Sequence, residues 1–466
     1  MQNLPIESKS FSEDTTLSRQ LGLPSAIAIV ISRIIGSGIF RTPGPIMALV
    51  GSTLLFGSVW IIGAVITIFA AICYAELVAM MPRSGGPYVY LKEAYGPLIA
   101  FLRGWAMFFV SETGAIAAVA LVFAEYTVAS ITLVSGVVLS HAVVVMLALL
   151  VIVFHTFINC FGVKLSGVVQ IIISSSKIVA LVYIVVACFT NNGNIQNFYH
   201  PLVPESFTLA HILGIGAALR YAFFAFSGWE GATYVAEEVK NPRKNLPLSL
   251  LVGIACVLIL YASTNAAYLF QVPVQYFSQS KWIAVDALQN ALGAIGALIV
   301  AYAVIINTFG NVGTQIMVKA RTWHAMASDN LFFKVCSTVH PKYKTPNNAI
   351  IVQGIWACIL VIFASMYKDS YKAVIDYFSA TGTIFNILTL GSVIVLRKKY
   401  PGIVRPFKAW GYPVTVILVI SFYVVYLVIT LITAFAPSLL GIIFTLSGLL
   451  YYWYKSTGKS KNEAPY

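Results

Sequence analysis

Charge is the first thing this sequence lacks: Asp, Glu, Lys and Arg together make up 10% of its 466 residues. Soluble proteins carry about a quarter of such residues, so the scarcity excludes an ordinary soluble domain. Cysteine is rare too, with six residues in all and none in pairs with metal-ligand spacing. This excludes a zinc site of the usual kind, and we expect free thiols without disulfides.

A catalytic constellation is missing as well. His324 and Asp329 have the H-x4-D spacing that some acyltransferases use, but two residues at one spacing arise readily by chance. No second catalytic element accompanies them. We therefore predict that the protein is not an enzyme, that it needs no cofactor and that it binds no metal.

Hydrophobic residues take the place of charge, at 59% of the chain. Apolar windows of about 20 residues, the length that a helix needs to cross roughly 30 Å of hydrocarbon, recur along nearly the whole sequence. The pattern predicts an all-α integral membrane protein with about twelve transmembrane helices. We place them at 21–49, 54–81, 97–128, 137–158, 165–190, 208–236, 245–271, 284–320, 347–367, 373–396, 411–432 and 434–454.

Basic residues are distributed unevenly over this map. Most fall on the side that holds both termini, and the other side receives only Arg41, Lys281, Lys368 and Lys372. Because cytosolic loops carry the excess of Lys and Arg, we predict a multi-pass protein of the plasma (inner) membrane with both termini in the cytosol. Basic loops beside anionic lipid head groups account for the net charge of +13, and no nucleic-acid partner is predicted.

The first predicted span, 21–49, contains the sequence SRIIGSGIFRTPGP. As one helix this span would measure roughly 43 Å at 1.5 Å per residue, longer than the membrane requires, so it has room for a break at Gly36-Ser37-Gly38. Unwound backbone at this depth is tolerated only where it lines a cavity or meets a ligand. Alternatively, the glycines serve close helix packing, and the first span alone is compatible with both interpretations.

The sixth predicted span, 208–236, is interrupted as well, by Ser227-Gly228 with Glu230 just behind. Each broken span opens a set of five spans, and because five is odd the second set enters the membrane inverted. Broken helices in corresponding positions of inverted halves are the best sequence indicator of a transporter's substrate site. The resulting segments are a cytosolic tail at 1–20, a first five-helix repeat at 21–190, an inverted second repeat at 208–396, helices 11 and 12 at 411–454 and a tail at 455–466.

The polarity of the broken helices predicts the ligand. In the first span, the half that begins at Ser37 and Gly38 directs N-terminal amides to mid-membrane and favours an anion. In the sixth span, the half that ends near residues 224–226 directs carbonyls there and favours a cation. An anion pole that faces a cation pole suits the carboxylate and ammonium groups of an α-amino acid.

The sequence resembles the amino acid–polyamine–organocation (APC) superfamily in four ordered stretches: IIGSGIF, YAELVAMMPRSGGPYVYL, FAFSGW followed by EEVKNPRKNLP, and VLRKKYPGIVRPFKAWGYP. Within the superfamily it looks most like the L-type amino acid transporters, which include the light chains of heteromeric transporters and their bacterial relatives. The resemblance implies a LeuT-type fold, with a 5+5 inverted repeat, broken helices 1 and 6, and alternating access around a midplane site.

The resemblance also implies the residues of the substrate site. Amides of the first break hold the substrate carboxylate, carbonyls of the second break hold its amine, and the Phe224 ring is the gate that closes over the substrate. The substrate-binding residues expected on this basis are Gly36, Ser37, Gly38, Ile39, Phe224, Ala225, Phe226 and Ser227.

Lys177 lies about thirteen residues into the fifth span, roughly 20 Å deep by helical rise. An ionisable residue at this depth is a functional candidate. In family members that do not use sodium, a lysine at this position of SKIVAL occupies the place of a sodium ion beside the first break, which implies carbonyl or hydroxyl partners around Gly36. The sequence leaves open whether Lys177 is a fixed cation or one that exchanges its proton.

Four further charges fall at membrane depth: Arg33, Glu112, Arg220 and Glu230. An isolated charge at the bilayer centre costs at least a few kcal/mol, so we expect these residues to pair, Arg33 with Glu230 or with Glu112. An unpaired Glu230 would favour a substrate with a cationic side chain, and an unpaired Arg33 would favour an acidic one.

Together these features predict a secondary transporter of L-α-amino acids, in the first place a sodium-independent exchanger. A proton-coupled symporter, a transporter of cationic amino acids or polyamines and a non-transporting amino acid sensor remain alternatives. Heteromeric light chains bind their heavy chain through a cysteine in the outer loop between spans three and four. The corresponding stretch here, YTVASITLVSGVVLSH, has none, so no disulfide-linked heavy chain is expected.

Overall fold

The computed structural model describes residues 19, 21–83, 85–161, 167–328, 330–343 and 345–459. Over these residues the chain is helical, and its one β-type contact is an isolated bridge between Leu21 and Val239. Asp329 and part of the predicted fifth span lie outside the described residues. The structure therefore confirms the all-α class.

The helices follow one another with short connections. The first group is α1 (Leu23–Ile34), α2 (Gly38–Arg41), α3 (Pro43–Val50), α4 (Thr53–Met80), α5 (Pro87–Tyr95), α6 (Pro97–Ala106), the π-helical turn η2 (Met107–Ser111), α7 (Glu112–Ser135), α8 (His141–Cys160), α9 (Gly167–Thr190) and the 3-10 turn η3 (Ile195–Phe198). The second group is α10 (Leu209–Ala225), the 3-10 segment η4 (Trp229–Glu238), α11 (Pro242–Gln271), α12 (Val274–Phe277), α13 (Ile283–Ser328), η5 (Lys334–Ser337), α14 (Asn347–Ser365), α15 (Ser370–Lys399), α16 (Val414–Thr433) and α17 (Phe435–Lys459).

Ten helices of the described chain are long and apolar enough to cross a membrane, and two shorter apolar helices, Ser176–Thr190 and Leu209–Ala225, coincide with the predicted fifth and sixth spans. The map of about twelve spans is confirmed at this level. The largest differences are at the ends of two spans, because the third continues to Ser135 and the eighth to Ser328. All six cysteines are free.

The first span is broken where its glycines predict. Helix α1 ends at Ile34, Ile35 has an extended backbone with ψ 92°, and helix resumes at Gly38. After one turn the chain passes Thr42 into α3, which begins at Pro43. Proline suits this first helical position because its missing N–H has no partner there in any case.

The sixth span is broken too, but its second half differs from the prediction. Helix α10 ends at Ala225, and Gly228 has φ 92°, a left-handed conformation that favours glycine. The segment that follows, η4, is a 3-10 helix where a continuous α-helix was expected. One physical reason is local packing, since a Cβ on Gly231 would lie 2.8 Å from Cγ of Arg33, so η4 runs tightly against α1.

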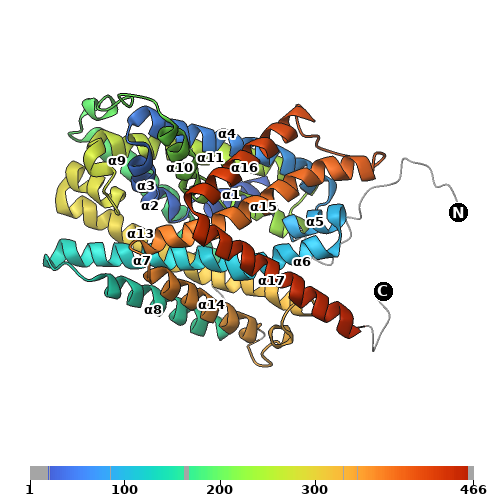
Figure 1. Ribbon diagram of the computed structural model, residues 1–466. Coiled ribbons are helices and arrows are strands. Elements are labelled where there is room, and N and C mark those ends of the chain that lie inside the picture. The colour runs from blue at the N-terminus through green and yellow to red at the C-terminus, as the bar shows by residue number, and fades with distance from the viewer. Residues whose placement is uncertain are drawn as a thin grey trace.

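Helices that are distant in sequence pack together to form the bundle (Figure 1). Helix α11 packs against both α1 and α4, α7 against α13, and α8 against α14. The segment from Pro97 to Ser135 is the most interior, with 72% of its most apolar window buried, against 17% in α17. The segment from Pro97 to Ser135 therefore lies in the interior of the bundle, and α17 lies at its periphery.

Labelling of single cysteines tests the predicted orientation. Figure 1 shows α7 ending at one end of the bundle and α17 at the other. In a variant without the natural cysteines, Val138→Cys, at a residue 85% exposed in the loop after α7, should react with a membrane-impermeant maleimide on intact cells. Lys342→Cys, at an exposed residue before α14, should react only after permeabilisation. The reverse pattern would show that the termini lie outside.

Candidate functional site

A cavity of about 250 Å³ lies between the two broken spans. The rest of its wall comes from α4, α6, η2, α7, α9, α13, α15 and α16. Of the predicted substrate-binding residues, five line the cavity: Gly36, Ser37, Gly38, Phe224 and Ser227. The other three, Ile39, Ala225 and Phe226, are buried and do not line it. The structure thus brings both breaks to one chamber but places three of the eight residues behind its wall.

The first break offers unsatisfied polar groups to this cavity. Among the described residues, the amides of Ser37 and Gly38 have no recorded backbone acceptor, as expected for N–H groups at the start of a helix. The Ser37 hydroxyl is also buried without a hydrogen-bond partner. Buried polar groups are nearly always paired in a complete complex. These donors therefore give the first break the chemistry of an anion acceptor.

The carbonyls of the second break are less free than the sequence predicts. The Phe224 oxygen accepts hydrogen bonds from the amide of Ser227 at 3.1 Å and from its hydroxyl at 2.7 Å. The Ala225 oxygen lies 3.1 Å from the hydroxyl of Tyr261. The prediction treated both carbonyls as unpaired because it considered the helix end without its own turn and without α11. The Phe224 oxygen thus already accepts two hydrogen bonds, and of these two oxygens only that of Ala225 keeps a second lone pair, so the cation pole is weaker than predicted.

Tyr261, on α11, joins the two breaks and was missed by the sequence analysis. Its hydroxyl lies 3.1 Å from the carbonyl oxygen of Ile34, at the end of α1, and 3.1 Å from that of Ala225, at the end of α10. Its ring stacks on Phe226 at 5.4 Å and meets Trp60 edge-on at 6.0 Å. A tyrosine in an apolar span carries no sequence signal that would predict this bridging contact.

Gly38 supports the alternative interpretation as well, namely that the glycines allow close packing of helices. A Cβ at this position would lie 2.5 Å from the Cα of Ala225, so α2 and α10 touch backbone to backbone there. Gly36 is different, since its Cβ would meet only the side-chain nitrogen of Asn311, at 3.4 Å. Close packing thus requires glycine at 38, and the same packing brings the second break against the first.

The predicted gate, Phe224, faces aromatic residues of α15. Its ring lies 5.9 Å from that of Tyr371, edge-on, and 5.7 Å from that of Phe378. Both Phe224 and Phe378 line the cavity, whereas Tyr371 is fully buried. Phe224 therefore lies in an aromatic group at the part of the cavity wall formed by α15, and its role as a gate stays a prediction.

Lys177 reaches the first break. Its ammonium group donates to the carbonyl oxygen of Ser32 at 3.1 Å, near the end of α1, and its side chain is 5% exposed. The resemblance implied a carbonyl or hydroxyl partner near Gly36, and the recorded partner is one turn earlier. Helix α9 is in this way linked to the last turn of α1, just before the break, by a charge-assisted hydrogen bond.

The buried charges pair differently from the prediction. Glu112 forms an ion pair with Lys319 on α13, and Arg220 forms one with Asp376 on α15 at 2.8 Å. Arg33 does not pair with Glu112, which α13 already neutralises, nor is an ion pair with Glu230 recorded among the described residues. Sequence reasoning named neither Lys319 nor Asp376 as a partner, although each is a charge inside a predicted apolar span.

Besides Lys177, whose recorded partner is a carbonyl oxygen, three charges line the cavity without an ion pair in the described chain: Arg33, Arg103 and Glu230. Arg103 is 7% exposed, its Nε has no partner, and its guanidinium lies 5.5 Å from the centre of the Phe385 ring. Because both signs are present, the cavity can neutralise either an acidic or a basic group.

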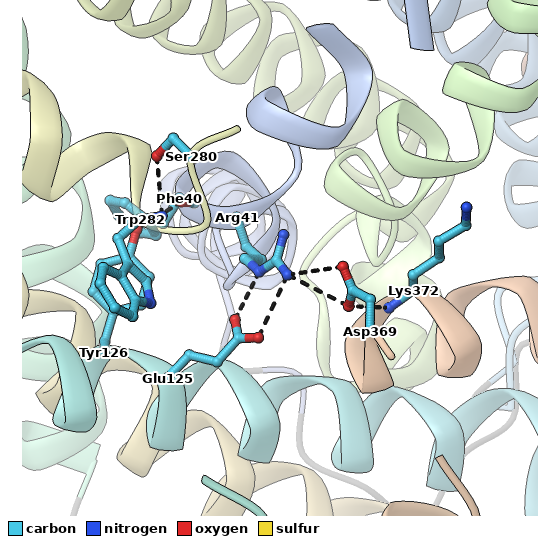
Figure 2. Close-up of polar contacts among 8 residues, drawn as sticks. All are labelled: Phe40, Arg41, Glu125, Tyr126, Ser280, Trp282, Asp369 and Lys372. Atoms are coloured by element: carbon cyan, nitrogen blue, oxygen red, sulfur yellow. Dashed lines mark hydrogen bonds and ion pairs between the residues drawn. The ribbon is translucent and has the colours of Figure 1, made fainter. Parts of the chain in front are cut away.

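Toward the predicted outer side, the buried charge of Arg41 is paired. Arg41, the last residue of α2, contacts Glu125 on α7 and Asp369 at the start of α15 (Figure 2). The Tyr126 hydroxyl donates to the carbonyl oxygen of Phe40 at 2.6 Å. Polar contacts thus hold α2 against α7 and α15.

Replacement of Lys319 tests how much its buried ion pair with Glu112 contributes to the stability of the fold. Lys319→Met leaves the Glu112 carboxylate uncompensated, so the free energy of unfolding in detergent should fall by about 3–5 kcal/mol. The double variant Glu112→Gln/Lys319→Met should recover most of this loss, because both charges are gone. Lys334→Met, at an exposed position, is the control. Equal stability of the single variant and the control would contradict the pairing.

Comparisons with known proteins agree with this geometry. The family model described as amino acid permease matches residues 21–454. The chain is 31% identical over 448 residues to the b(0,+)-type amino acid transporter 1 of Mus musculus, covering 94% of this chain and 88% of that protein. It is 32% identical over 411 residues to the large neutral amino acids transporter small subunit 2 of Homo sapiens, covering 86% of this chain and 74% of that protein. The chain therefore belongs to the amino acid permease family of the APC superfamily, in its L-type transporter branch.

Proposed function

We propose that this membrane protein carries L-α-amino acids across the plasma membrane by alternating access, as a sodium-independent exchanger. The observation that carries the proposal is the cavity of about 250 Å³ between two broken spans, with amide donors at one break and carbonyls at the other. A free α-amino acid presents the matching carboxylate and ammonium groups. The names of the relatives, a b(0,+)-type amino acid transporter and a large neutral amino acids transporter, support the same substrate class.

Exchange without sodium rests on Lys177. Its ammonium group already donates to the Ser32 carbonyl at the first break. A bound sodium ion would have to compete with this fixed cation for the same oxygens, at a high electrostatic cost inside the membrane. A substrate is then the only species that has to be carried in each direction. The proposal includes the predicted inverted repeats, 21–190 and 208–396, with termini in the cytosol.

The protein works without a disulfide-linked heavy chain in this proposal. The connection between α7 and α8, residues 136–140, contains no cysteine, and all six cysteines elsewhere in the described chain are free. A non-covalent partner is compatible with the same structure.

Uptake into proteoliposomes tests the transport mode. Vesicles preloaded with an unlabelled neutral amino acid should take up the labelled amino acid at least several times faster than empty vesicles, with no dependence on sodium. Empty vesicles in which an inward proton gradient alone drives uptake would instead establish proton symport. Saturable binding without flux in any vesicle would identify a sensor. A panel of neutral, acidic and basic competitors identifies the substrate side chain.

Lys177→Met tests the role of the buried ammonium group. The variant loses a charge-assisted hydrogen bond worth about 1.5–3 kcal/mol, so the exchange rate should fall about tenfold or more. Lys368→Met, on an exposed loop residue, is the matched control. Thermal stability separates two roles: a variant that melts like wild type but exchanges slowly has lost a functional cation, and one that melts early has lost an architectural one. Exchange at the wild-type rate would contradict both.

A further inference from the structure

Arg41 is an unusual residue for its position. It is the last residue of the single-turn helix α2, inside the first broken span, and its side chain is only 1% exposed. Its Nε donates to Glu125 at 2.6 Å, and its Nη2 lies 3.3 Å from a carboxylate oxygen of Asp369 (Figure 2). The guanidinium carbon lies 4.8 Å from the centre of the Tyr371 ring. We refer to Arg41, Glu125 and Asp369 as the Arg41 cluster.

The cluster ties together three elements that enclose the cavity. Arg41 lies three residues after Gly38, at the other end of the same helical turn. Glu125 belongs to α7, whose residue Val119 lines the cavity, and Asp369 is the residue just before α15, which carries Phe378 on the cavity wall. If the cavity opens toward this side by separation of α15 from α2 and α7, the contact between Arg41 and Asp369 opposes that motion.

The two carboxylates hold Arg41 unequally. Glu125 is 12% exposed and makes two contacts with the guanidinium, at 2.6 and 3.4 Å. Asp369 is 31% exposed, contacts it only at 3.3 and 3.5 Å, and also accepts the backbone N–H of Lys372. Removing one partner of a buried pair is costly, whereas a half-exposed carboxylate can exchange its partner for water. The Asp369 contact is therefore the easier one to break.

Asp369 remains charged in this setting. Partial burial works against its ionisation, but Arg41 and the backbone N–H of Lys372 outweigh that effect and lower the pKa of the Asp369 carboxyl below its ordinary value. The contact with Arg41 is therefore fully formed at neutral pH.

The opposite side of the cavity shows the complementary arrangement. Arg33, Arg103 and Glu230 line the cavity there, and no ion pair is recorded for them within the described residues. Ser227, at the second break, is exposed. Toward the predicted outside the buried Arg41 is held by two carboxylates, whereas in the part of the chain that the structure describes these three charges lie near only one ion pair, that of Glu112 with Lys319.

We propose that the Arg41 cluster is a latch that holds the cavity closed toward the outside, and that opening to that side breaks the Arg41–Asp369 contact while Arg41 remains bound to Glu125. The latch rests on the alternating access of the proposed function. Arg41 and Glu125 then move as one body with α2 and α7, and Asp369 moves away with the start of α15.

A cysteine beneath the latch reports on its state. The probe is Val119→Cys in a variant without the natural cysteines, labelled on intact cells by a membrane-impermeant thiol reagent. Val119 lines the cavity and is 3% exposed, so labelling from outside should be slow. Adding Asp369→Asn should raise the labelling rate about fivefold or more, since the rate follows the population of the outward-open state. The asparagine side chain keeps an oxygen that can accept the hydrogen bond from the backbone N–H of Lys372.

Two matched variants complete the design. Asp369→Glu keeps the charge and should label within about twofold of the parent, because the population of the open state is little changed. Glu205→Gln removes an exposed carboxylate from the loop before α10 and should also label at the parent rate. A rate for Asp369→Asn equal to that of Glu205→Gln overturns the latch. An equal acceleration by Asp369→Glu overturns the ion pair as its basis.

Transport measurements distinguish failure of the latch from failure of the proposed function. With the outward-open state more populated, Asp369→Asn should lower the apparent KM for external substrate, because affinity scales with the fraction of the competent state. If the parent protein transports and Asp369→Asn changes neither labelling nor KM, the latch is wrong and the function stands. If Asp369→Asn accelerates labelling but the parent moves no amino acid, the latch is a gate of the cavity and the proposed transport is wrong.

Discussion

The close approach of α2 and α10 is the constraint on which the site depends. Gly38 lies so near Ala225 that a Cβ would be 2.5 Å from the Cα of that residue, and the Tyr261 hydroxyl lies 3.1 Å from the carbonyl oxygens that end α1 and α10. The two broken spans therefore meet through backbone, in surroundings where water does not compete for hydrogen bonds. Because the amide donors and the carbonyls are fixed by this contact, their spacing is a property of the fold and does not depend on any side chain that lines the cavity.

Side-chain charges have a different task. Glu112 with Lys319 and Arg220 with Asp376 cross-link helices within the bundle, which gives each charge the partner that the membrane interior requires. The Arg41 cluster does the same at the predicted outer end. Since a backbone site recognises only the α-carbon groups of a substrate, the choice among amino acids is left to residues on the remaining wall, where α7, α13 and α15 contribute both polar and aromatic groups.

Much of this architecture could be predicted from the sequence, because the determining signals are local. Apolar windows give the spans, and Gly36-Ser37-Gly38 and Ser227-Gly228 give the breaks to within two residues. The partners of the buried charges could not be predicted, because pairing depends on which faces of distant helices meet. Glu112 and Lys319 are 207 positions apart along the chain, and nothing near either residue indicates the other. The bridging hydroxyl of Tyr261 and the 3-10 conformation of η4 could not be predicted for the same reason, since both depend on contacts with helices that are distant in sequence.

The position of Arg41 links occupancy of the site to its closure. Helix α2 is a single turn, so its first amide, at Gly38, and its last side chain, Arg41, form one rigid unit. A substrate carboxylate bound at the amides of Ser37 and Gly38 would contact the same helical turn whose Arg41 side chain is bound by Glu125 and Asp369. A ligand can shift a conformational equilibrium only through its different affinity for the two states. If the latch operates as proposed, this difference in affinity arises at α2, which carries both the amide donors and Arg41. Coupling between the substrate and the latch then requires no other helix of the bundle.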